Sequence, residues 1–116
     1  MKKDLKIKRK YLSEYCNLVD EVINLAQCEA RNIETGTQTL WTADWLESVL
    51  TEFKQLKIFA QQGRVYFEYG TKQTMLSATY LMIDTLENLH STQLGQKISE
   101  FQRLYDKMNT GICRLL

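Results

Sequence analysis

Proline is absent from this chain of 116 residues, and glycine occurs only five times. Average usage would supply about 5% proline, the residue that interrupts helical hydrogen bonding most strongly. The glycines, at positions 36, 63, 70, 95 and 111, divide the chain into segments of helical length. With 44% hydrophobic and 25% charged residues, the composition is typical of a globular protein. The length predicts a single helical domain over residues 1–116.

Long apolar runs and paired cysteines are also missing. The longest apolar run, Tyr80-Leu81-Met82-Ile83, is far shorter than the roughly 20 residues of a membrane span. The charged N-terminal segment has no apolar signal core, so we expect a cytoplasmic protein that does not enter a membrane. The three cysteines, Cys16, Cys28 and Cys113, include no C-x-x-C pair. This argues against a zinc site or a disulfide framework and favours buried, reduced thiols.

Apolar residues recur at helical spacing in four segments. The predicted helices cover about residues 5–34, 42–62, 71–90 and 92–109. Their apolar faces include Tyr15, Val19, Val22 and Ala26 in the first, Leu46, Val49 and Phe53 in the second, Met75, Leu76 and Ile83 in the third, and Leu94, Ile98 and Phe101 in the fourth. Four amphipathic helices joined by short loops predict an all-α fold, a four-helix bundle.

Several residues are typical of helix ends. Thr35-Gly36 follows the first segment, and Thr42 precedes the second as a predicted N-cap, with Asp44 in the first turn. Ser91 or Thr92 is the predicted cap of the fourth helix, and Asn109-Thr110-Gly111 is its predicted stop. The first helix would be about 40 Å long or more, against about 30 Å for a helix of twenty residues. We therefore expect it to extend beyond the bundle or to pack against a second copy in a homodimer.

The segment around residues 64–72 is rich in aromatic residues between two glycines. Its aromatic and basic residues are the predicted contact site for a protein partner, because tyrosine and arginine are enriched at binding hot spots: Arg64, Tyr66, Phe67, Tyr69 and Lys72. We expect a corner between the second and third helices, whose rings cover the end of the core. The alternative is a short extended segment at 64–69, paired with residues 37–41.

The first ten residues form a basic arm. Six of them are basic and one is acidic, whereas the rest of the chain has 9 basic and 13 acidic residues, a net charge of −4. The basic side chains could neutralise phosphates of a nucleic acid: Lys2, Lys3, Lys6, Lys8, Arg9 and Lys10. The acidic remainder of the chain argues against that partner.

The chain contains one histidine, His90, in the sequence Glu87-Asn88-Leu89-His90. Glu-x-x-His places a carboxylate and an imidazole on one helix face, as in di-iron bundle proteins, but such a site needs two of these units and two further glutamates. A histidine at a helix C-terminus is also favoured by the helix dipole alone. We see no catalytic constellation and expect no enzyme and no cofactor, with a metal site at Glu87 and His90 as an alternative.

The composition and the helical pattern together favour a protein that acts by contacting another protein. An adaptor, a chaperone, an immunity protein and a regulator all fit this expectation. The first alternative is a nucleic-acid-binding regulator that uses the basic arm, and the second is a metal-binding bundle.

Overall fold

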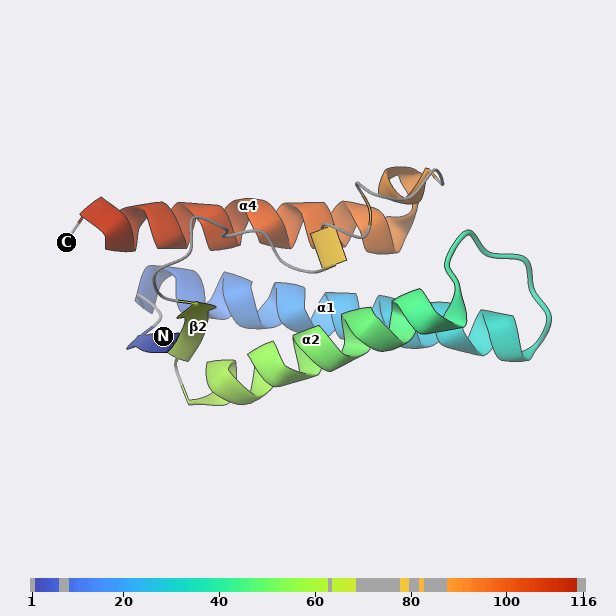
Figure 1. Ribbon diagram of the computed structural model, residues 1–116, viewed down its shortest axis with the longest axis horizontal. Coiled ribbons are helices and arrows are strands. Elements are labelled where there is room, and N and C mark those ends of the chain that lie inside the picture. Colours follow the sequence, from blue (N-terminus) through green and yellow to red (C-terminus); the bar gives the residue numbers. More distant parts are fainter. Residues whose placement is uncertain are drawn as a thin grey trace.

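The computed structural model describes the backbone of residues 2–6, 9–62, 64–68, 78–79, 82 and 88–114, and the side chains of residues 11–62, 78–79, 82 and 88–107. These residues form β1 (Lys2–Lys6), α1 (Arg9–Glu34), α2 (Ala43–Gln61), β2 (Arg64–Glu68), the 3₁₀ helix η1 (Leu89–Ser91) and α4 (Gln93–Arg114). The helix α1 lies between α2 and α4, and both neighbours run antiparallel to it (Figure 1).

The prediction of a four-helix bundle is wrong, although the described part of the chain is mainly helical as expected. That part contains three long α-helices instead of four. Most of the predicted third helix lies outside the described residues, and its end, Leu89–Ser91, is a 3₁₀ helix. The backbone of Asn88 leaves the helical region at φ −84° and ψ 61°, and the Ser91 hydroxyl donates a hydrogen bond to the Asn88 carbonyl at 2.8 Å. Such side-chain bonds to the backbone compete with α-helical hydrogen bonding.

Helix α1 ends where the sequence predicts but begins later. Gly36 adopts φ 81°. The amide of Thr37 donates a hydrogen bond to the Asn32 carbonyl at 2.7 Å, and the amide of Gly36 donates one to the Ile33 carbonyl at 3.1 Å. This pair of bonds is a Schellman motif, which requires a left-handed residue that glycine adopts most easily. At the other end, the predicted start at residue 5 is wrong, because Lys2–Lys6 form strand β1.

The predicted starts of α2 and α4 are confirmed, whereas the predicted end of α4 is wrong. Helix α2 spans Ala43–Gln61, and the Thr42 hydroxyl caps it by accepting a hydrogen bond from the Trp45 amide at 3.2 Å. Helix α4 begins after Thr92, whose hydroxyl accepts a bond from the Gly95 amide at 2.9 Å. The predicted stop at 109–111 is wrong, because α4 continues to Arg114. A glycine ends a helix by turning left-handed, whereas Gly111 stays helical.

Residues 64–68 are extended and do not form the predicted corner between two helices. They form strand β2, which pairs antiparallel with β1 and places Lys2 opposite Glu68 and Lys6 opposite Arg64. The extended alternative therefore describes these residues, but its expected pairing with residues 37–41 is wrong. A strand needs a partner for its backbone hydrogen bonds, and the N-terminal segment supplies it.

The core lies where the faces of the three long helices meet. The ring of Phe101 in α4 packs 5.0 Å from that of Tyr15 in α1 and 5.1 Å from that of Phe53 in α2, between centroids. The side chains of Val19, Val22, Val49 and Ile98 are also fully buried around this contact. Among the residues described between α2 and α4, Ala78, Thr79 and Met82 are buried as well. No helix in the described ranges is both long enough and apolar enough to cross a lipid bilayer.

The segment between α1 and α2 is held against the start of α4. Trp41 is 2% exposed, and its indole nitrogen donates a hydrogen bond to the Thr92 hydroxyl at 3.1 Å. The hydroxyl of Thr39 accepts a bond from the Trp41 amide at 3.2 Å and donates one to Glu29 in α1. A tryptophan buried in this way needs a partner for its N–H group. The Trp41 bond connects this segment to the start of α4, and the Thr39 bond connects it to α1.

Gly95 allows η1 and α4 to approach closely. A β-carbon at this position would lie 1.9 Å from the carbonyl oxygen of Leu89. We expect Gly95→Ala to lower the free energy of unfolding by about 1–3 kcal/mol or more, because the turn would have to move away from the helix. Urea denaturation measures the change, with Gln96→Ala on the exposed face of α4 as the control. Equal stability of the two variants would contradict the observed contact.

Candidate functional site

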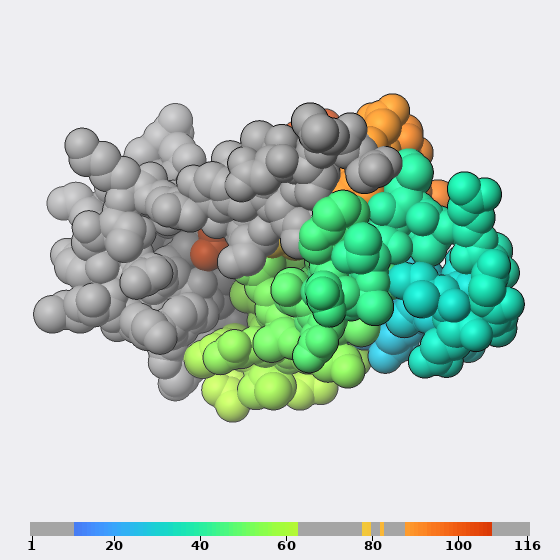
Figure 2. All heavy atoms as spheres, turned by 45° about the vertical axis from the view of Figure 1, so that its right-hand side comes forward, coloured from blue at the N-terminus to red at the C-terminus, as the bar shows by residue number. Residues whose placement is uncertain are grey.

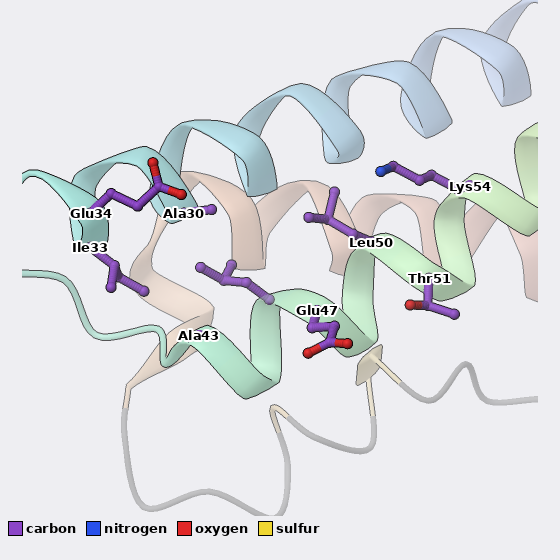
Figure 3. A pocket seen from close by; sticks show the side chains of 9 residues that line it. Ala30, Ile33, Glu34, Ala43, Glu47, Leu50, Thr51 and Lys54 are labelled. Carbon is purple, nitrogen blue, oxygen red and sulfur yellow. The ribbon is translucent and has the colours of Figure 1, made fainter.

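An open groove lies between the end of α1 and the beginning of α2. Its volume is about 320 Å³. Its lining is apolar at the floor and polar or charged at the rim: Ala30, Ile33, Ala43, Leu46 and Leu50, then Glu34, Glu47, Thr51 and Lys54. Figure 3 shows Glu34 on the α1 side and Glu47 on the α2 side of this space.

The groove arises where small side chains stand between two close helices. Ala30 in α1 and Ala43 in α2 offer only methyl groups, whereas Leu46 beneath them is 1% exposed and belongs to the core. Ile33 and Leu50 are partly buried and pack against that core. In Figure 2 a strip of α1 lies recessed between α2 in green and the turquoise residues that follow α1. The Schellman turn and the anchored Trp41 hold these two helix ends in place.

A second hollow lies between α1 and α4, with a volume of about 480 Å³. Its lining is mostly polar: Glu21, Asn24, Leu25, Gln93, Gln96 and Lys97. The ammonium of Lys97 lies 2.8 Å from a carboxylate oxygen of Glu21 and 3.3 Å from one of Glu100. The hydrogen bond to Glu21, followed by that to Glu100, raises the pKa of Lys97. Its charge is already balanced within the protein, so this hollow offers no unpaired cation to a ligand.

A chain of buried polar groups connects residues near Thr79 with α4. The Thr79 hydroxyl donates to the side-chain oxygen of Gln102 at 3.0 Å, and the amide nitrogen of Gln102 donates to Asp106 at 2.8 Å. A carboxylate oxygen of Glu52 in α2 accepts a bond from the Ala78 amide at 3.0 Å. Because each buried group has a partner, we interpret this network as structural.

The hydroxyl of Tyr15 is a different case, because it is buried and has no hydrogen-bond partner among the described residues. Burial raises the pKa of Tyr15 far above its usual value, and the charge of an ionised Tyr105 would raise it further. Burial likewise raises the pKa of Tyr105, helped by the carboxylate of Glu52. Burial, with a smaller effect of Asp20, raises the pKa of Cys16. These shifts favour the neutral forms, which are poor bases and nucleophiles.

The residues predicted as sites from the sequence lie elsewhere. Arg64, Tyr66 and Phe67 belong to β2, where the structure describes their backbone, and Tyr69 and Lys72 lie outside the described residues. Of the basic arm, Lys2, Lys3 and Lys6 belong to β1, Arg9 and Lys10 begin α1, and Lys8 lies outside the described residues. The arm is therefore partly strand, and its binding to a nucleic acid stays a prediction.

Only one residue of the predicted metal pair lies in the described part of the chain. His90 is exposed in η1, and Glu87 lies outside the described residues. Within the described ranges, no three histidine, cysteine, aspartate or glutamate side chains are close enough to hold a metal ion. A metal site at Glu87 and His90 stays a prediction.

Leu46 was expected on the apolar face of the second predicted helix, and the groove was not predicted as a site. Ile33, Leu46 and Leu50 follow the helical pattern of buried positions, which does not show that a neighbouring helix leaves some of them partly open. The available signal was the pair of alanines, Ala30 and Ala43, at facing ends of two helices.

We expect Tyr15→Phe to keep or raise the free energy of unfolding at pH 7, by up to about 1–3 kcal/mol, because it removes an unpaired buried hydroxyl. Tyrosine ionises in the unfolded chain near pH 10, whereas burial keeps Tyr15 neutral in the folded chain. The free energy of unfolding is therefore unaffected by Tyr15 ionisation below pH 10, and falls above pH 10 by up to about 1.4 kcal/mol per pH unit.

Urea denaturation at pH 7, 10 and 11 tests both statements about Tyr15. The variant should lose less stability than the wild type between pH 10 and pH 11. An identical loss in both proteins would show that folding does not raise the pKa of Tyr15. A variant that is clearly less stable at pH 7 would show that the hydroxyl has a hydrogen-bond partner in the folded protein.

The comparisons with known proteins add no family to these observations. No family model, curated protein or solved structure shows significant similarity to this chain.

Proposed function

We propose that this chain is a non-catalytic binding protein that accommodates part of another protein in the groove between α1 and α2. The observation that carries the proposal is the combination of a partly open apolar floor with a charged rim. Protein interfaces have this organisation, with an apolar centre and a polar periphery. The groove also lies on two long helices that share a packed core, and rigid elements of this kind suit a binding site.

We expect two further contact surfaces outside the groove, although the proposal does not depend on them. Strand β2 holds Arg64, Tyr66 and Phe67, so a second contact with the partner at this end of the molecule remains our expectation. Self-association through α1, a helix of 26 residues, is likewise expected. A cytoplasmic location is part of the proposal, because the odd number of cysteines is typical of a reducing compartment.

The groove variant Ala30→Arg tests the proposal. Arginine is a good helix former, so the fold should tolerate it, while its long side chain would fill the groove. Tagged wild-type and variant proteins are used to capture partners from a lysate of the source cells, with melting temperatures measured in parallel. We expect a protein captured by the wild type to be recovered at least about tenfold less with Ala30→Arg, the effect of about 1.4 kcal/mol of lost binding.

The matched control is Asn17→Arg, which adds the same charge at an exposed position of α1 and should recover the same partner as the wild type. Recovery of the same partners by Ala30→Arg would contradict the proposal. Loss only in Tyr66→Ala/Tyr69→Ala, with unchanged melting, would contradict it too and would assign binding to the β2 end instead.

A further inference from the structure

The lining of the α1–α2 groove contains two glutamates, Glu34 of α1 and Glu47 of α2. Two other carboxylates of α1 do form ion pairs: Asp20 with Lys57 of α2 at 3.0 Å, and Glu21 with Lys97 of α4 at 2.8 Å. By contrast, neither Glu34 nor Glu47 forms an ion pair within the described part of the chain. Glu34 and Glu47 therefore line the same groove from opposite helices (Figure 3).

The local charge at the groove is negative. Glu34 and Glu47 contribute two negative charges and Lys54 contributes one positive charge. Glu34 is the last residue of α1, and Ala43 in the lining is the first residue of α2. The C-terminus of α1 carries a partial negative charge and the N-terminus of α2 a partial positive charge. These partial charges offset each other, so the charged side chains determine the net charge of the groove.

The floor of the groove selects the shape of the occupant. Ala30, Ile33, Leu46 and Leu50 are all aliphatic and offer no hydrogen-bonding group. A volume of about 320 Å³ is at the lower end of the range of ligand pockets, which is about 300–1,000 Å³. It suits a few aliphatic side chains from one short segment, and amphipathic helices bind such grooves with side chains spaced three or four residues apart.

We propose that the occupant is a short amphipathic helix of a partner protein that inserts leucine or isoleucine side chains between Ala30 and Leu50 and places a lysine or arginine near Glu34 and Glu47. This inference rests on the proposed function and specifies the partner's chemistry. The apolar contact provides most of the affinity, whereas the carboxylates select basic partners over acidic ones, because like charges at an interface are strongly unfavourable.

Three synthetic peptides test the inference on the full chain. Each has leucines at helical spacing on one face, and the other face carries lysines, glutamines or glutamates. Each is titrated into ¹⁵N-labelled protein, and the shifts of the backbone amides give the binding site and the Kd. We expect the lysine peptide to shift the amides of Ala30, Ile33, Leu46 and Leu50, and to bind at least about tenfold more tightly than the glutamate peptide.

The double variant Glu34→Gln/Glu47→Gln should bring the lysine and glutamine peptides to within about threefold of each other. The matched control Glu14→Gln/Glu100→Gln removes the same charge far from the groove and should keep the wild-type preference. If the glutamine peptide binds the groove of the wild type as tightly as the lysine peptide, the charge selection is wrong and the groove remains a protein-binding site. If none of the peptides shifts the groove amides, both the inference and the proposed function are contradicted.

Discussion

The contact of Phe101 with Tyr15 and Phe53 is the interaction on which the rest of the structure depends. It joins one aromatic ring from each of the three long helices, at centroid distances of 5.0 and 5.1 Å. Such pairs add to the stabilisation that comes from burying the rings. The Tyr15 hydroxyl has no hydrogen-bond partner in the part of the chain that the structure describes, so close packing of the rings outweighs the cost of one unsatisfied polar group.

The groove is a consequence of the same arrangement at the other end of α1. The aromatic contact and the hydrogen bond between Trp41 and Thr92 determine how α1, α2 and α4 lie. With these positions determined, the side chains of Ala30 and Ala43 are too small to fill the space between their helices. An apolar surface that remains open in a packed domain is a common feature of binding sites.

Much of the helical structure could be predicted from the sequence. The end of α1 at Gly36, the Thr42 cap and the apolar faces of α2 and α4 follow from local chemistry within a few residues. The strand pair could not be predicted, because the lysine-rich residues of β1 have low strand propensity and their partner lies about sixty residues away along the chain. The predicted end of α4 at Gly111 was also wrong, because a glycine permits a turn without requiring one.

The sequence by itself determined which residues prefer helices, where two of those helices start and which faces are apolar, because these properties depend on neighbours three or four positions away. Only the tertiary structure decided which apolar residues stay partly exposed and which carboxylates of the described residues form an ion pair. Glu21 and Glu34 are indistinguishable as exposed glutamates on one helix, yet Glu21 meets Lys97 and Glu34 borders the groove. The difference comes from the residue that each neighbouring helix places opposite them, and that depends on contacts between segments far apart in the chain.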